Sequence, residues 1–243
     1  MGIRKKMVLL SAVNLNKRYG SLTPLNNFSF ELGRGEILGV IGPNGAGKTT
    51  LLNVLSGVTR PDSGKIYLER RDITRAPPHV RFNLGIGRTF QNVRPFLDLT
   101  VKENLVVSLR ARKADENHVN ELLEIFKLEH FAQAKVKNCD LLVRKKTEIA
   151  KAIVGHPKLV LLDEPFAGLI DSEIEDLSSV IKNIKLRNVS FIIVEHVVRA
   201  LMKLATRVIV MHGGSKIAEG TPSEIVQNHE VIRVYLGDKY VAS

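Results

Sequence analysis

The chain has 243 residues, of which 44% are hydrophobic, and this is enough for one large or two small domains with a buried core. Its one cysteine, Cys139, excludes an intramolecular disulfide and two-cysteine metal knots, which favours a reducing, cytosolic setting. The formal net charge of +11 suggests nucleic acid, but the basic residues are spread along the chain without a nucleic-acid-binding motif, so we expect no nucleic acid among its partners.

The first hundred residues are rich in strand-like runs. Arg4, Lys5 and Lys6 before a short apolar run imitate a signal peptide, but NKRYG follows in place of a cleavage site, so we predict an exposed tail that leads into a first strand. We predict strands in MVLLSAVNL, NNFSFEL, EILGVIG and KIYLER, which lie between turn residues. No apolar run approaches the length of a bilayer crossing, so we expect no membrane span.

Helical patterns take over from about Thr100 to Gly155. The segments VKENLVVSLRAR, ENHVNELLEIFKLEHF and VRKKTEIAKAIVG all place apolar residues at helical spacing. The segments LVLLDEP, VSFIIVE, RVIVMHGG and KIAEGTP then alternate with helices predicted from Asp171 to about Leu186 and from near Val197 to Leu204. This alternation predicts an α/β fold with a mainly parallel sheet and crossover helices.

A glycine-rich loop follows the strand EILGVIG and precedes TLLNVLSGV, a helical pattern that ends at Gly57. The loop fits GxxxxGK[ST], a pattern whose glycines let backbone N–H groups surround a phosphate at a helix N-terminus. We expect Lys48 to hold the β- and γ-phosphates and Thr49 to ligate Mg²⁺. The predicted phosphate-binding residues are Gly42, Pro43, Asn44, Gly45, Ala46, Gly47, Lys48, Thr49 and Thr50.

Two acids end the hydrophobic run LVLLDEP. An acid at the carboxyl end of a strand beside a phosphate loop can orient Mg²⁺ through water, and Asp163 fits this role. Glu164 can polarise the attacking water. On spacing alone, Glu164 could instead be a helix-initiating acid before Pro165.

With these two motifs, the chain resembles the ATPase subunits of ABC transporters over nearly its whole length. The resemblance implies an α/β P-loop fold with a mixed sheet core, an antiparallel β subdomain and an inserted helical subdomain, and it implies ATP and Mg²⁺ as ligands. Tyr19 resembles the aromatic residue that stacks on adenine. Gln91 resembles the catalytic glutamine that joins the Mg²⁺ site to the transmembrane subunit. His196 resembles the histidine that contacts the γ-phosphate and holds the attacking water.

The resemblance also divides the chain. We predict a single ATPase domain over residues 1–243, with a catalytic core and β subdomain at about 1–99 and 156–243 and a helical subdomain at 100–155. Energy coupling in the family passes through the groove between these parts, so the residues around Gln91 to Glu103 are expected to receive a helix from a membrane subunit.

The segment before TEIAKAI departs from the family pattern. The family carries a signature, LSGGQ, that presents a serine hydroxyl and glycine N–H groups to the γ-phosphate bound by the other subunit of a head-to-tail dimer. Counting back without gaps from Thr147, this signature falls on Cys139-Asp-Leu-Leu-Val143, which matches it at no position. Asp140 brings a carboxylate near a triphosphate, and two leucines replace glycines. Asp140 is also a good N-cap, so we predict a well-capped helix from Leu141 without a phosphate contact.

A second departure concerns Ile170, which stands where the family usually has Asp or Asn; a displacement of that role onto Asp171 stays open. With Glu164 and His196 intact and the signature degenerate, we predict an asymmetric heterodimer. In it, the site of this chain is completed by the signature of a different ATPase subunit.

Several segments most resemble the ATPases of branched-chain amino-acid importers, which commonly pair two different ATPase subunits: IGPNGAGKTTLLNVLSGV, GRTFQN, LTVKENL, DEPFAGL and EIVQNHEVIRVYLG. The resemblance implies transmembrane permease subunits as partners, a solute-binding protein reached through the complex, and a cytoplasmic, peripheral position on the inner face of the cell membrane. The alternatives are an ATPase of lipopolysaccharide export, which shares much of this wording, or a nucleotide-binding subunit with little hydrolysis of its own.

Overall fold

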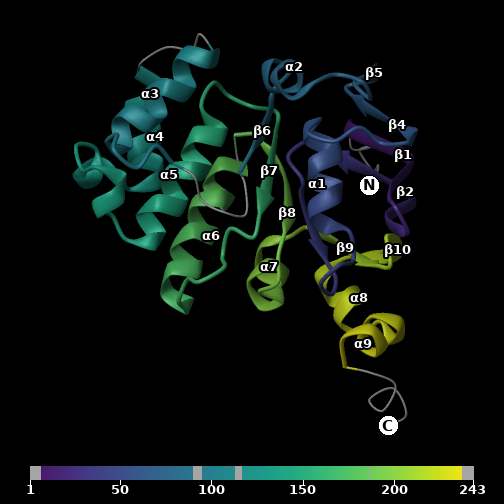
Figure 1. Ribbon diagram of the computed structural model, residues 1–243. Coiled ribbons are helices and arrows are strands. Elements are labelled where there is room, and N and C mark those ends of the chain that lie inside the picture. The colour runs from purple at the N-terminus through teal and green to yellow at the C-terminus, as the bar shows by residue number, and fades with distance from the viewer. Residues whose placement is uncertain (1–6, 90–94, 113–116, 186, 237–243) are drawn as a thin grey trace, which may run out of the picture.

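A six-stranded sheet forms the centre of the computed structural model, which describes residues 7–89, 95–112, 117–185 and 187–236 (Figure 1). In spatial order its strands are β10 (Ser215–Gly220), β9 (Arg207–His212), β3 (Ile37–Ile41), β8 (Ser190–Val194), β7 (Leu159–Asp163) and β6 (Ile86–Arg88). Neighbouring strands are parallel except β9 and β10, which pair antiparallel. The predicted mixed sheet is therefore confirmed.

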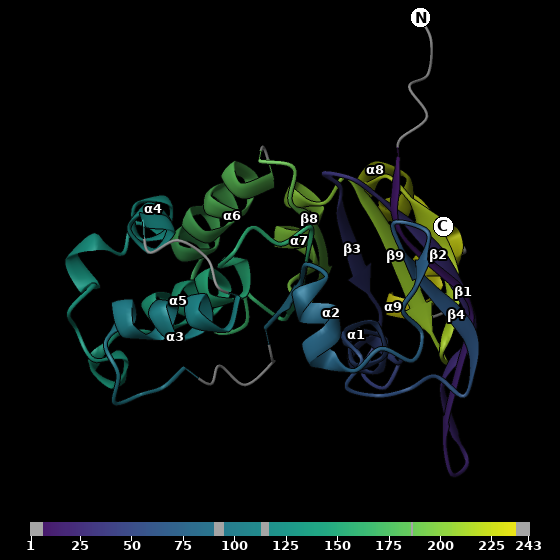
Figure 2. The same cartoon turned by 90° about the horizontal axis from the view of Figure 1, so that it is seen from above.

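A second, antiparallel sheet lies on one side of the molecule, opposite the main group of helices (Figure 2). Its strands, in spatial order, are β2 (Leu22–Gly33), β1 (Val8–Tyr19), β4 (Ser63–Leu68) and β5 (Arg71–Asp72). Strands β1 and β2 are longer than predicted, because the polar NKRY segment continues to pair with β2 as far as Tyr19 opposite Leu22. The extended pairing carries Tyr19 to the end of the hairpin.

Helices cover both faces of the six-stranded sheet. Helix α1 (Lys48–Ser56) ends at Gly57 as predicted, with that glycine in the left-handed conformation at φ 81°. The helices on the other side are α3 (Val101–Arg112), α4 (Asn117–Phe126), α5 (Leu141–Ile153), α6 (Asp171–Lys185) and α7 (Val198–Leu204). Among the described residues, the structure contains no helix with both the length and the apolar character needed to cross a bilayer.

The remaining helices are short. They are α2 (Pro78–Asn83), α8 (Pro222–Val226), α9 (His229–Leu236) and the 3₁₀ turns Glu129–Phe131 and Val136–Asn138. Helix α8 begins with a capping box, in which Thr221 accepts from the Glu224 N–H and the Glu224 carboxylate accepts from the Thr221 N–H. These two side chains therefore provide hydrogen-bond acceptors for two backbone N–H groups at the start of α8.

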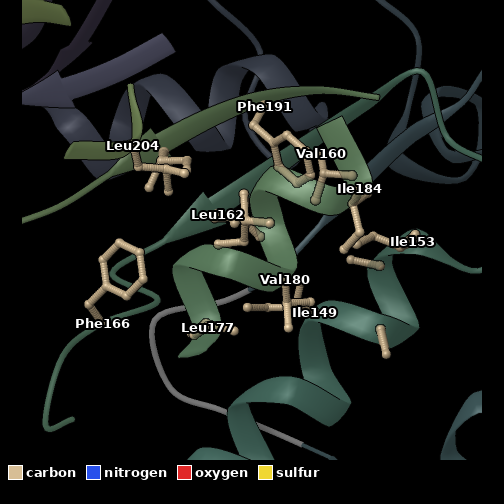
Figure 3. Close-up of a cluster of buried hydrophobic side chains, with 14 of the residues drawn as sticks. Ile149, Ile153, Val160, Leu162, Phe166, Leu177, Val180, Ile184, Phe191 and Leu204 are labelled. Atoms are coloured by element: carbon tan, nitrogen blue, oxygen red, sulfur yellow. The ribbon is translucent and has the colours of Figure 1, made fainter. Parts of the chain in front are cut away.

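Alternate residues of the central strands face two separate hydrophobic clusters, because side chains along a strand alternate between its faces. Val160 and Leu162 of β7 pack in the cluster with α5 and α6, and Leu159 and Leu161 pack in the cluster with α1 and the second sheet. Figure 3 shows the first cluster, where β7 and β8 meet the two helices. Strands that are buried on both faces explain the continuous apolar run LVLL.

Removing a side chain from this cluster should cost stability. Leu177 of α6 is fully buried in it, so Leu177→Ala should lower the free energy of unfolding by about 2–5 kcal/mol. Val107 of α3 is exposed, and Val107→Ala should change the same quantity by less than about 0.5 kcal/mol. Denaturant titrations of the two variants give the comparison, and equal losses would contradict this assignment of the core.

Candidate functional site

The glycine-rich loop between β3 and α1 needs glycine at two of its positions. Gly42 and Gly47 have φ values of 155° and 103°. A Cβ at Gly42 would collide with the carbonyl oxygen of Met211, and one at Gly47 would collide with that of Pro24. The loop is therefore held against the backbone of β9 and β2, and a side chain larger than that of glycine would not fit at either of these two positions.

The side chain of Lys48 folds back onto this loop. Its Nζ donates hydrogen bonds to the carbonyl oxygens of Gly42 at 2.7 Å and Pro43 at 2.9 Å. Burial lowers the pKa of this ammonium, and the nearby charges of Glu164 and Asp163 oppose that shift. The result is a buried cation at the first turn of α1, where the sequence predicts phosphate binding.

Asp163 ends β7 as a buried carboxylate with 3% of the residue exposed. Burial raises its pKa, and the charges of Arg88 and Lys48 act in the opposite direction. Within the described part of the chain, Asp163 Oδ1 has no hydrogen-bond partner. Asp163 and Thr49 line the same cavity, of about 790 Å³. A buried carboxylate oxygen without a partner and a hydroxyl that line one cavity form a donor set that suits Mg²⁺.

Glu164 and His196 meet at the edge of the same region. The N–H of Glu164 donates to the carbonyl oxygen of Val194 at 2.9 Å, and the residue takes a left-handed conformation at φ 50°. This turn directs its carboxylate to His196, with Oε1 2.8 Å from Nε2. An uncommon backbone conformation for glutamate is thus associated with a side-chain pair that faces an open pocket.

That pocket has a volume of about 670 Å³. Of the predicted site residues, those that line it are Tyr19, Asn44, Gly45, Ala46, Gly47, Lys48, Thr49, Thr50, Glu164 and His196. Gly42 and Pro43 lie beneath it as acceptors for Lys48, and Asp163 lies in the neighbouring cavity. Gln91 lies outside the described residues. The segment from Ser21 to Pro24 also lines the pocket, and no sequence motif indicated it.

Two buried charged residues that the motifs did not assign hold this edge together. Glu195 accepts hydrogen bonds from the N–H groups of Phe166, His196 and Val197 at 2.6–3.0 Å. Lys145 of α5 donates to the carbonyl oxygens of Glu164 at 3.1 Å and Pro165 at 2.9 Å. A glutamate that directly follows the apolar run FIIV was the available signal for the first, and Lys145 gave none.

The segment at the signature position forms the predicted helix start. Asp140 has extended backbone, and its Oδ1 accepts the N–H of Val143 at 2.8 Å, so α5 begins at Leu141 with Asp140 as its N-cap. Leu141 is 41% exposed, and Ile170 is 66% exposed. Asp171 pairs with Arg199 at 2.7 Å, and both side chains are largely exposed. The predicted N-cap is confirmed.

The known proteins that this chain resembles also bind ATP, according to their descriptions. A family model described as ABC transporter matches residues 25–167, and one described as branched-chain amino acid ATP-binding cassette transporter matches residues 215–241. The chain is 36% identical over 239 residues to the lipopolysaccharide export system ATP-binding protein LptB of Escherichia coli K12, covering 96% of this chain and 99% of that protein. It is 38% identical over 247 residues to the probable branched-chain amino acid transport ATP-binding protein LivG of Archaeoglobus fulgidus, covering 95% and 96%. A solved nucleotide-free ATP-binding cassette from an ABC transporter superposes with a TM-score of 0.87 at 30% identity, covering 96% of this chain and all of that chain.

The N-cap at Asp140 should be measurable in the isolated chain. Asp140→Ala removes the acceptor for the Val143 N–H and should lower the free energy of unfolding by about 1 kcal/mol. Asp140→Asn keeps an acceptor oxygen and should lose clearly less. Urea titrations of both variants decide the point, and an alanine variant as stable as the parent would show that the cap does not stabilise α5.

Proposed function

Because the chain belongs to the ATP-binding subunits of ABC transporters, we propose that it powers the uptake of branched-chain amino acids. The chain is an ABC-type ATPase that binds ATP, and such subunits dimerise and work with transmembrane permease subunits. The contact between Glu164 and His196 at the edge of the pocket carries the catalytic part of the proposal. The choice of solute is supported by the family match at residues 215–241 and by the LivG relative.

The pocket and the neighbouring cavity together hold residues that suit each part of Mg-ATP. We assign Tyr19, at the end of the β1–β2 hairpin, to stacking on adenine. The loop N–H groups and Lys48 bind the β- and γ-phosphates, with the N-terminus of α1 directed at them. Thr49 and Asp163 would hold Mg²⁺, which supplies positive charge to the phosphoryl group during transfer. Gln91, outside the described residues, is proposed to join this site to the permease.

Hydrolysis then follows from the positions of two side chains. A water between Glu164 and the γ-phosphate attacks phosphorus and gives its proton to the Glu164 carboxylate while the bond to the bridging oxygen breaks, leaving ADP and phosphate. His196, held 2.8 Å from that carboxylate, contacts the γ-phosphate and keeps the water in line. Glu195 fixes the backbone N–H of His196 and so limits where its ring can lie.

Replacing the base should separate binding from turnover. Glu164→Gln should lower the rate of phosphate release by the assembled transporter by at least about 100-fold, since the amide cannot accept the proton, while ATP binding is retained. Glu175→Gln is a matched control, because Glu175 is an exposed acid of α6 paired with Lys203 at 3.8 Å. Full activity in the Glu164 variant would exclude this residue as the base.

We further propose that the second ATPase subunit is a different chain. Asp140 already caps α5, so its carboxylate stays at the helix start, where it would face the partner's triphosphate and repel it. Leu141 adds an exposed apolar side chain at the same place. The partner should therefore bring an intact signature to the pocket of this chain, whereas the pocket of the partner would be completed poorly.

Light scattering of the Glu164→Gln chain tests this arrangement. Alone with Mg-ATP it should stay monomeric, although a fluorescent ATP analogue binds. Adding Asp140→Ser, Leu141→Gly and Leu142→Gly restores small residues at the signature position and should produce an ATP-dependent dimer. Dimerisation of the Glu164→Gln chain without these changes would contradict the heterodimer.

The groove between the core and the helical part is the proposed permease contact. The cavity of about 790 Å³ is lined by α1 and α2 on one side and by α3 and α5 on the other. Phe96 is half exposed and lies next to this cavity, because the ammonium of Lys151, which lines the cavity, is 5.0 Å from the centroid of the Phe96 ring. We propose that residues 100–155 form a helical subdomain beside a core of 1–99 and 156–243. We also propose that the whole chain is cytoplasmic and binds at the inner face of the cell membrane through the permease.

A lipopolysaccharide exporter is the second candidate, because LptB relatives align over nearly the whole chain. The two candidates differ in what stimulates hydrolysis by the reconstituted transporter. An importer should respond to a solute-binding protein loaded with leucine, isoleucine or valine. Stimulation by lipopolysaccharide alone would favour the exporter.

A further inference from the structure

Arg88, the last residue of β6, has a buried guanidinium that bonds to α1. Only 8% of its side chain is exposed. Its Nη1 donates to the carbonyl oxygen of Leu52 at 3.2 Å and to Ser56 Oγ at 2.5 Å, and its Nη2 donates to Asn53 Oδ1 at 2.7 Å. One side chain thus reaches two turns of the helix that follows the phosphate loop.

The same guanidinium faces Asp163. Its Nη2 lies 3.9 Å from Asp163 Oδ2, an ion pair longer than a direct hydrogen bond. The next residue, Thr89, accepts the N–H of Asp163 with its Oγ1 at 3.3 Å and donates its own N–H to the carbonyl oxygen of Leu161 at 2.9 Å. The end of β6 therefore fixes both the backbone and the charge environment of Asp163.

The face of α1 that Arg88 contacts is also the face that carries Thr49. Thr49, Asn53 and Ser56 follow one another at i, i+4 and i+7, a spacing that puts them on one side of a helix. All three line the same cavity as Asp163 and Arg88. The guanidinium of Arg88 therefore lies between the face of α1 that carries Thr49, Asn53 and Ser56 and the end of β7.

We propose that Arg88 is a positioning residue of the magnesium site: it sets the separation between Asp163 and the Thr49 face of α1 without touching nucleotide. The proposal rests on the proposed function, in which Thr49 and Asp163 hold Mg²⁺. A lysine could not do the same, because only the planar fork of arginine can donate to three groups of α1 while presenting charge to Asp163. Outer-shell groups of this kind orient metal ligands.

Arg81 of α2 provides a matched control. It is also buried, and its Nη1 donates to the carbonyl oxygens of Val54 and Leu55 on the same helix, each at 2.7 Å. Its other hydrogen bonds within the described part of the chain go to the carbonyl oxygens of Ala76 and Thr74. Arg81 therefore anchors α1 through backbone groups alone.

The test is the Mg²⁺ dependence of nucleotide binding to the full chain, followed with a fluorescent ATP analogue. Arg88→Lys and Arg88→Met should bind the analogue in EDTA as the parent does, but should need about tenfold more Mg²⁺, or more, for half-maximal tightening. Arg81→Lys should lower the thermal unfolding temperature and leave the Mg²⁺ requirement within about twofold of the parent, since the hydrogen bonds that Arg81 makes in the described part of the chain go to backbone carbonyl oxygens and not to Asp163.

Three results would overturn the proposal. An unchanged Mg²⁺ requirement in both Arg88 variants would make Arg88 an anchor of α1 only. An equal rise in the Arg81 variant would assign the effect to α1 rather than to Asp163. If the parent chain binds nucleotide without any response to Mg²⁺, the assignment of Thr49 and Asp163 fails first, and this proposal fails with it. Arg88→Lys keeps the charge, so the measurement stands even if Arg88→Met does not fold.

Discussion

The parallel ladder of β3, β8 and β7 is the constraint on which the site depends. Its register places Val40 opposite Val194, and Val194 opposite Asp163, so the three strands end at one level. The ladder continues one step beyond the strands, because the Glu195 N–H donates to Val40 and the Glu164 N–H donates to Val194. The glycine-rich loop, the two acids and the histidine therefore meet at one edge by hydrogen bonding of the backbone, and a slip of register would separate them.

Charges collect at this edge in a buried setting. Burial lowers the pKa of Lys48 and Lys145 and raises the pKa of Asp163 and Glu195, so desolvation disfavours the charged form of each group. Backbone groups offset part of this cost: Glu195 accepts three N–H groups and each lysine donates to two carbonyls. Of these four groups, Asp163 is the one with a buried side-chain oxygen, Oδ1, that has no hydrogen-bond partner within the described residues, which is consistent with a carboxylate that binds a cation.

Local signals were predictable, and long-range contacts were not. The loop, the helix end at Gly57 and the N-cap at Asp140 depend on residues within a few positions of one another, and sequence predicted all of them. The length of β1 was missed because its polar end is stabilised by pairing with β2 and not by burial. Arg88 could not be assigned, since its partners lie more than thirty residues earlier in α1 and more than seventy later in β7. The T-P-S-E start of α8 is a local signal that was present and unused.

Cys139 lies immediately before the cap of α5, and its position has a practical consequence. The thiol is buried, donates to the carbonyl oxygen of Lys135 at 3.5 Å, and has a pKa raised chiefly by that burial. A buried, protonated thiol reacts slowly with alkylating reagents. Since the sequence holds no other cysteine, the rate of alkylation reports how often the start of α5 opens. The chain thus carries a natural chemical probe next to the segment that we propose to face a second ATPase subunit.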